Sequence, residues 1–377
     1  MSELAAVPPI AALPTSIALF VGWAPSGPVD QALRVKSVAD YDRDFGGLDA
    51  GALLGYALRH FFGNGGSDAY VLRIIGPNAD AAVDPNDPGF VDALHETFAA
   101  GGPPDQIARF NLLCVPGLTD PGAIAMLQDF AGQRGAFLIA DCAGNDTPTS
   151  VLASLAGKTG ATAANSALYF PWVVASDPLR NNSPRAFPPS GFVAGIFART
   201  DAQRHVWKAP AGTEASVAGA TGLAVHLDDA TEQQLNARAV NCLRSFPGAG
   251  IVVFGARTLA GADGRAAEWK YVPVRRLASF IEQSVQAGIQ WVVFEPNGEP
   301  LWSQLRQSVG NFMQTLFMQG AFQGSTPGLG YVVRCDQTTT TQADIDRGEV
   351  NIVIGFAALK PGEFVEIRIA QPAGGSR

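Results

Sequence analysis

The sequence predicts an α/β protein with a parallel or mixed sheet. Short apolar runs that are typical of buried strands alternate along the chain with longer segments whose apolar residues recur at helical spacing. Glycine and proline occur 42 and 26 times, which indicates many turns. The 377 residues exceed the roughly 250–300 at which one hydrophobic core stops growing, so we expect two packed units.

Ten short segments are predicted to be strands because each is rich in Val, Ile, Phe or Tyr. They are Ile17–Val21, Tyr70–Ile75, Asn111–Val115, Phe137–Ala140, Leu168–Val174, Ile251–Phe254, Trp291–Phe294, Tyr331–Arg334, Asn351–Phe356 and Phe364–Ile369.

Three segments between these strands have apolar stripes at helical spacing. The clearest helix is predicted over Leu301–Gln319, where the face opposite the stripe is polar and Arg306 is its only charge. Thr341, followed by Asp344, is predicted to be the N-cap of a short helix that reaches Gly348. The stripes comprise Leu53, Leu54, Ala57, Leu58 and Phe61; Leu277, Phe280, Ile281, Val285 and Ile289; and Trp302, Leu305, Val309, Phe312, Met313 and Leu316.

Charge and composition exclude several classes of partner. There are 26 basic and 34 acidic side chains, a formal charge of −8, which is the wrong sign for binding nucleic acid or anionic membrane. No apolar run approaches the ~20 residues that span a bilayer, and the first basic residue is Arg34, so we expect no secretory signal and a soluble protein made in the cytoplasm. The four cysteines are far apart and form no CxxC pair, so we expect reduced, buried thiols.

Catalytic and metal-binding motifs are largely missing, so we expect no enzyme, no metal and no cofactor. A serine hydrolase needs a histidine base, and His60, His95, His205 and His226 all lie in uninformative contexts. Ser190 in PPSGF lacks the flanking glycine of a nucleophile elbow. The string LAGKTG lacks the first glycine of a phosphate-binding loop, so its lysine, Lys158, is interpreted as a solvated loop residue. An α/β hydrolase-like enzyme remains the alternative from another class.

The C-terminal segment Phe364–Ile369 alternates between apolar and charged residues and lies between Pro361 and Pro372. Such a terminal strand can leave its own domain and pair with the open edge of a neighbour's sheet. On these residues alone, an ordinary edge strand of its own sheet is favoured by about two to one.

Motifs along nearly the whole chain resemble the contractile tail sheath proteins. The resemblance begins with PTSIALFVGWAPSGPVDQALRVKSVADYDRDFGG (Pro14–Gly47) and LGYALRHFFGNGGSDAYVLRI (Leu54–Ile74). It continues in the same order through FNLLCVPG, ALYFPWV, PPSGFVAGIFARTDAQRHVWKAPAG, FPGAGIVVFGARTLA, EWKYVPVRRLASFIEQSV, QWVVFEPNGEPLW, YVVRCDQTTTTQADIDRG and EFVEIRIAQ.

The resemblance implies a subtilisin-like central α/β domain without the protease's catalytic residues. It also implies an α+β inner domain formed by the N- and C-terminal regions, with extended terminal arms. The expected division is an N-terminal arm at 1–16, part of the inner region at 17–95, the central domain at 96–262, a C-terminal sheath domain facing the tube at 263–360, and a C-terminal arm at 361–377.

The function implied is that of a structural sheath subunit of a phage tail, a tailocin or an extracellular injection system. Such subunits stack as hexameric rings around an inner tail tube and contract to drive it through a target envelope. The implied partners are further copies of the chain, paralogous sheath proteins, the inner tube protein, and the baseplate and tail terminator or cap, with no nucleic acid and no direct membrane insertion. Assembly is expected in the bacterial cytoplasm, and a non-polymerising tail terminator or baseplate component is the alternative within this context.

The resemblance also assigns candidate contact residues. Phe364, Val365, Glu366, Ile367, Arg368 and Ile369 are the inter-subunit arm, which raises pairing with a neighbour above the ordinary edge strand. Arg275, Arg276, Arg306, Gln307 and Gln314 are the candidates that face the tube, and a solvated helix face and polar N-terminal helix turn are an equally favoured interpretation of these residues. The family commonly has a longer N-terminal arm, so its donor strand is here missing, replaced by Val7–Leu13, or supplied by a paralogue.

Overall fold

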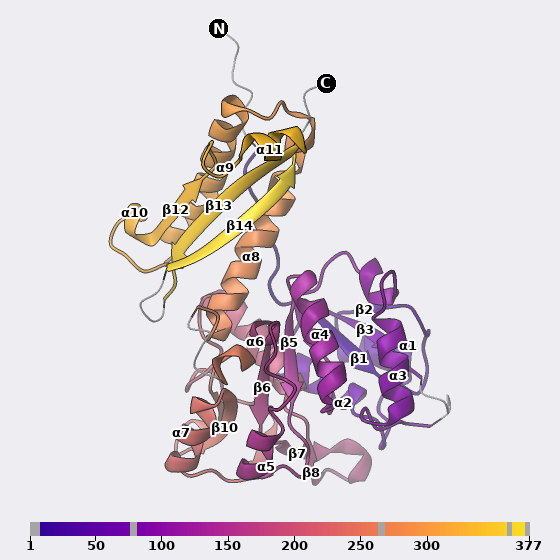
Figure 1. Ribbon diagram of the computed structural model, residues 1–377. Coiled ribbons are helices and arrows are strands. Elements are labelled where there is room, and N and C mark those ends of the chain that lie inside the picture. Colours follow the sequence, from indigo (N-terminus) through magenta and orange to yellow (C-terminus); the bar gives the residue numbers. More distant parts are fainter. Residues whose placement is uncertain (1–7, 76–80, 263–267, 360–363, 374–377) are drawn as a thin grey trace. The chain divides into compact units, whose positions relative to one another are not determined.

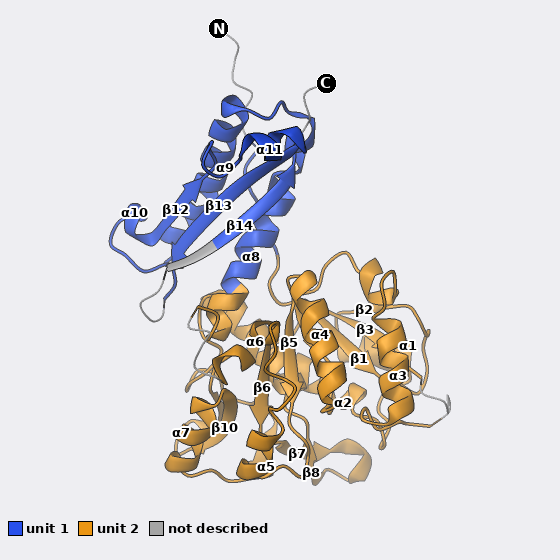
Figure 2. Cartoon of the chain, in the orientation of Figure 1, with its two compact units in different colours: residues 1–13, 277–377 blue, residues 14–276 orange. Residues whose placement is uncertain are grey.

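The computed structural model describes residues 8–75, 81–262, 268–359 and 364–373, with side chains from Ile367 onward in the last range. The chain forms two compact units (Figure 2). The large unit is Pro14–Arg276, and the small unit combines Met1–Leu13 with Leu277–Arg377.

An eight-stranded mixed sheet forms the centre of the large unit (Figure 1), in the order β11-β10-β6-β5-β4-β1-β3-β2. The strands from β10 to β3 run parallel to their neighbours, and only the outermost strands, β11 and β2, pair antiparallel. A smaller antiparallel sheet has the order β8-β7-β9. The bounds are β1 Ala18–Gly22, β2 Leu33–Val35, β3 Ala69–Arg73, β4 Leu112–Cys114, β5 Phe137–Asp141, β6 Ser166–Phe170, β7 Val173–Asp177, β8 Ser183–Phe187, β9 Ala220–Leu223, β10 Val240–Phe246 and β11 Gly250–Phe254.

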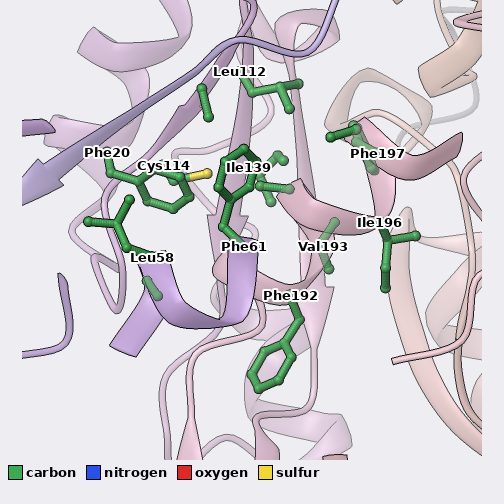
Figure 3. Packing of buried hydrophobic residues seen from close by; sticks show 14 of the residues in the cluster. Phe20, Leu58, Phe61, Leu112, Cys114, Ile139, Phe192, Val193, Ile196 and Phe197 are labelled. Carbon is green, nitrogen blue, oxygen red and sulfur yellow. The ribbon is translucent and has the colours of Figure 1, made fainter. Parts of the chain in front are cut away.

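Helices cover both faces of the large sheet. Successive strand residues such as Leu19 and Phe20 point to opposite faces, and they belong to two separate buried clusters. One cluster contains residues of α1, α2 and α6, of which Figure 3 labels several from α2 and α6. The other contains residues of α3, α4, α5 and α7. The bounds are α1 Val38–Phe45, α2 Leu54–Gly63, α3 Pro88–Thr97, α4 Pro121–Gln133, α5 Pro148–Ala153, α6 Ser190–Arg204 and α7 Asp229–Ala237, with 3₁₀ turns η1 Pro103–Gln106, η2 Ala163–Asn165, η3 Pro178–Arg180 and η4 Leu259–Ala262.

Helices α2 and α6 approach so closely that their backbones touch. Gly191 and Gly195 lie four residues apart on α6, and a Cβ atom at these positions would be 2.5 Å from the carbonyl oxygen of Ala57 and 2.4 Å from that of Phe61. Only glycine therefore fits at this contact.

The small unit is an α+β unit with a three-stranded antiparallel sheet in the order β12-β13-β14. Its strands are β12 Tyr331–Arg334, β13 Glu349–Ala357 and β14 Phe364–Pro372. Its helices are α8 Val272–Gly288, which begins in the large unit, α9 Glu299–Met318, α10 Pro327–Gly330 and α11 Gln342–Asp346, with the 3₁₀ turn η5 Gln290–Phe294. The predicted cap is confirmed, because the Thr341 side chain accepts from the backbone of Asp344 and the Asp344 side chain accepts in return.

The α/β class is confirmed, but three local predictions are corrected. Trp291–Phe294 is the 3₁₀ turn η5 rather than a strand, since a short apolar run does not distinguish a strand from a helical turn. The single strand predicted at Leu168–Val174 is two strands, β6 and β7, in different sheets. Lys158 is only 1% exposed because its loop lies against α4, where the Lys158 carbonyl accepts from Gln128.

The units differ from the expected division of the chain. Residues 17–95 belong to the large unit, because β1 pairs with β3 on one side and with β4 on the other, in the middle of the sheet. The large unit extends past residue 262 to Arg276, so the boundary between the two compact units falls inside α8.

Candidate functional site

Ser190, the serine that the sequence analysis weighed as a nucleophile, belongs to a closed hydrogen-bond cluster. The Ser190 hydroxyl donates to Asp141 Oδ2 at 2.7 Å, and the Ser190 amide donates to Oδ1 at 2.8 Å. The amide of Gly117 donates to Oδ2 at 2.9 Å. Burial raises the pKa of Asp141 to about 6, while these three donors act against the rise. Both side chains are buried. The Asp141 carboxylate therefore stabilises the N-terminus of α6, and the Ser190 hydroxyl is not exposed to a substrate.

His60 does not complete a catalytic triad. Its ring stacks on Phe192 at a centroid distance of 3.8 Å, and its Nδ1 is buried without a hydrogen-bond partner. Burial lowers the pKa of His60 to about 3, so the imidazole stays neutral in the folded chain at neutral pH. This histidine is a packing residue between α2 and α6.

We predict that His60→Phe reduces the loss of stability in mild acid. The unfolded chain takes up a proton on His60 below pH ~6.5 and the folded chain does not, so the stability present above that pH is lost as pH falls. Relative to the parent, the variant should gain up to about 2 kcal/mol in unfolding free energy between pH 8 and pH 5. Urea unfolding at both pH values measures this difference, and an equal difference at the two pH values would contradict the assignment. Asp141 titrates in both proteins, so its contribution cancels.

The described part of the chain contains no group of three or more His, Cys, Asp or Glu side chains placed to hold a metal ion. Cys114, Cys142, Cys242 and Cys335 are buried, and burial raises the pKa of each thiol. None of the described helices combines the length and the apolarity needed to cross a bilayer.

Two of the candidates for tube contact lie in the large unit, and their side chains are already engaged there. Arg276 is buried and pairs with Asp201 at 2.6 Å, so it is removed as a surface contact. Arg275 is half-buried, donates to Asn165 Oδ1 at 2.9 Å and stacks over the Trp269 ring. The sequence placed both on a polar helix start, but it did not indicate that α8 begins inside another unit.

The other three candidates lie on α9 in the small unit. Arg306 donates to the carbonyl of Cys335 and pairs with Glu299. Gln314 accepts a hydrogen bond of 2.9 Å from the Tyr331 hydroxyl, whereas Gln307 is exposed. The exposed stripe of α9 has i, i+4 spacing and is made of Ser303, Gln307, Asn311 and Thr315. We call this set the α9 stripe; the sequence predicted its first three residues as part of the polar face.

The candidate arm is paired with its own chain in the isolated subunit. Strand β14 pairs antiparallel with β13 along its whole length, from Phe364 opposite Ala357 to Pro372 opposite Glu349. Ile367 and Ile369 are buried and Arg368 is exposed, which matches the predicted alternation. The side chains of Phe364, Val365 and Glu366 lie outside the described residues.

The described part of the N-terminal segment is a coil held by the small unit. Ser308 on α9 donates to the Pro8 carbonyl at 3.0 Å, and the Leu13 amide lies 3.3 Å from Ser284 Oγ on α8. Ile10 packs so closely on Gly288 that a Cβ there would lie 2.7 Å from it. Residues 8–13 form no strand, so the expected replacement strand at Val7–Leu13 is not present in this part, and Val7 lies outside the described residues.

Two family models match the chain. The phage tail sheath protein central domain matches residues 106–259, and the phage tail sheath C-terminal domain matches residues 265–371. Together they account for more than two thirds of the sequence.

Curated relatives are similar over about half of the chain. A tail sheath protein of Vibrio phage KVP40 is 28% identical over 188 residues, which are 50% of this chain and 27% of that protein. A putative prophage major tail sheath protein of Pseudomonas aeruginosa is 25% identical over 195 residues, 50% of this chain and 47% of that protein. The chain therefore spans about a quarter to a half of the length of these relatives.

Solved structures are similar over nearly the whole chain. The helical sheath of the anti-feeding prophage in its contracted state is 29% identical with a TM-score of 0.75, covering 97% of this chain and 96% of that one. The sheath complex of an extracellular contractile injection system, PVC, in its contracted state is 25% identical with a TM-score of 0.75, covering 98% and 96%. A chain of the anti-feeding prophage baseplate is 29% identical with a TM-score of 0.73.

Proposed function

Because the chain belongs to the phage tail sheath family, we propose that it is a structural sheath subunit of a contractile phage tail or a phage-tail-like injection system. The similarity to contracted sheath structures over 97% of the chain is the observation that carries this proposal. The subunit has no enzymatic role in the proposal, in keeping with the enclosed Ser190–Asp141 cluster.

In this proposal the subunits stack as hexameric rings around an inner tail tube. The baseplate triggers contraction, and the sheath drives the tube through the target envelope. The partners are further copies of this chain, the inner tube protein, the baseplate and the tail terminator or cap. Assembly takes place in the bacterial cytoplasm, and the finished particle is a phage tail or a released extracellular particle.

We propose that β14 links neighbouring subunits by strand exchange. In the isolated chain β14 is an edge strand whose only partner within the described sheet is β13. Antiparallel pairing has the same register whether the two strands come from one chain or from two, so exchange keeps the hydrogen bonds of β13 and the burial of Ile367 and Ile369. In the free subunit β14 therefore pairs with β13 of its own chain, and in the polymer it pairs with β13 of a neighbour.

Sedimentation velocity of the purified chain tests the sheath proposal. We expect large, polydisperse polymers if the chain supplies every strand of the link. A stable monomer that polymerises only with a paralogous sheath protein would identify that paralogue as the source of a linking strand. A monomer that never polymerises, with the tube protein or with paralogues, would contradict the proposal and favour a non-polymerising tail component.

The α9 stripe is the proposed contact with the inner tube. We predict that Gln307→Glu weakens co-assembly with the tube at least about tenfold, because a charge then enters an uncharged polar interface. Pull-down of the tube protein with assembled sheath measures the effect. Ala343→Glu, which adds a charge at an exposed position of α11, is the matched control. Equal tube recovery by the two variants would remove the α9 stripe from the interface.

A further inference from the structure

The chain passes between the two units at two places, and both are fastened to one buried side chain of the large unit. The crossings are Leu13–Pro14 and Arg276–Leu277. Next to the first, the Thr15 hydroxyl donates to Asp201 Oδ2 at 2.7 Å. Next to the second, Arg276 donates to Oδ1 at 3.0 Å and to Oδ2 at 2.6 Å.

The same arginine also joins the two crossings directly. Arg276 donates to the Thr15 carbonyl at 2.9 Å, so its guanidinium holds both the α6 carboxylate and the backbone of the first crossing. It lies 4.8 Å from the ring centroid of Phe197, one turn earlier on α6. The ion pair between Asp201 and Arg276 is therefore the centre of a small cluster. We call this set the Asp201 cluster; its members are Thr15, Phe197, Asp201 and Arg276.

Neither the stability of the large unit nor that of α6 explains why Asp201 and Arg276 form a buried ion pair. The side chains of Arg276 and Asp201 are each 4% exposed, and burying two charges costs free energy that a well-packed apolar pair would not require. Asp201 lies in the last turn of α6, where a negative charge is unfavourable to the helix dipole. The ion pair instead fixes the position of Arg276 relative to α6, because a bidentate contact between a guanidinium and a carboxylate has one geometry.

Beyond the cluster, both the first crossing and α6 lead directly into the core of the large unit. The Ile17 amide donates to Asn111 Oδ1 at 3.1 Å, and β1 then enters the middle of the sheet. Asp201 belongs to the helix whose glycines touch the backbone of α2. A load on either crossing would therefore reach the sheet and the α2–α6 pair.

We propose that Asp201 is the common anchor by which the large unit holds both chain crossings, so that force on the small unit enters the large unit at this carboxylate. Asp201 is a positioning residue in this proposal. Its anchoring role stands on the contacts alone, whereas the transmission of force rests on the proposed sheath function.

Hydrogen–deuterium exchange of the purified full-length chain tests the anchor. Thr15→Val removes one donor to Asp201, and we expect about tenfold faster exchange both at Ile17 and in the first turns of α8, residues 276–280. Asp201→Asn should accelerate exchange at both places at least about 100-fold, because it leaves Arg276 buried without a counter-charge. Thr15→Ser keeps the hydroxyl and should match the parent.

A control variant at a different buried ion pair shows whether the effect is specific to Asp201. Arg185→Met removes another cation that pairs with a buried carboxylate, Asp177 at 3.2 Å. It should affect β7, β8 and the neighbouring Tyr56 of α2, but neither Ile17 nor the first turns of α8. If Asp201→Asn does not fold, the comparison of Thr15→Val with Thr15→Ser still tests whether Asp201 holds both crossings. A change confined to the residues around Thr15, with α8 unaffected, would overturn the common anchor.

The same variants test force transmission in assembled sheath. We expect Thr15→Val subunits to form extended sheath but to contract in a smaller fraction of particles than the parent. Normal contraction by a variant whose exchange is raised would overturn the transmission of force. If the parent chain itself forms no sheath, the proposed function fails, while the exchange result still decides whether Asp201 is the anchor.

Discussion

Replacing Gly195 by alanine is expected to destabilise the large unit by about 1–2 kcal/mol. The added methyl group would lie 2.4 Å from the Phe61 carbonyl oxygen and 2.7 Å from Asn64 Cβ, so one helix must shift. Overpacking against rigid backbone costs about 1–3 kcal/mol or more and outweighs the helix propensity that alanine gains over glycine, about 1 kcal/mol. Urea unfolding followed by circular dichroism measures the change.

Gly310 on α9 provides the matched control for this substitution. It is a helix-interior glycine with no atom within 4 Å of the added methyl group, so Gly310→Ala is expected to raise stability by up to about 1 kcal/mol. A Gly195→Ala variant as stable as the parent would show that α2 and α6 do not touch as described.

A pair of cysteines on facing strands should report whether β14 is exchanged between subunits. Asn351 and Ala370 are register partners on β13 and β14. In the monomeric double variant Asn351→Cys, Ala370→Cys, oxidation should give an internal cross-link and a monomer band on a non-reducing gel. In assembled sheath, the same oxidation should give a ladder of covalently joined subunits, because each β14 then lies beside a neighbour's β13.

The four native cysteines are buried and do not compete in this experiment. Subunits oxidised before assembly should not polymerise until a reductant opens the cross-link. Assembled sheath that yields only monomer bands would contradict strand exchange. Deletion of the residues after Pro361 should leave monomers or short oligomers, but it also removes Ile367 and Ile369 from the core, so the cross-link is the sharper result.

The sequence predicted the elements whose period and capping are local. Helix α9 has an apolar stripe over about four turns, and α11 has its Thr341–Asp344 box, so both could be predicted from neighbouring residues alone. By contrast, the turn at Trp291–Phe294 depends on tertiary packing, because the same four apolar residues suit a strand or a buried helical turn. Strand β10 was not predicted, although it pairs with β6 in the main sheet.

Side-chain environments were harder to predict than elements. The resemblance suggested a tube-facing position for Arg276, and the incomplete phosphate-loop motif suggested a solvated loop position for Lys158, but distant parts of the chain bury both side chains. The partner of Arg276 is Asp201, which lies 75 residues away, and no spacing rule connects them. The boundary between the compact units falls inside a continuous helix, where composition and turn residues do not change, so local sequence patterns do not indicate it.

The measurement that tests the sheath assignment most directly is negative-stain electron microscopy of cells that express this chain with its inner tube protein. We expect hollow cylinders built around the tube, with a width that reports the extended or contracted state. Compact monomers alone, from a chain with β14 intact and with paralogous sheath proteins also present, would contradict it.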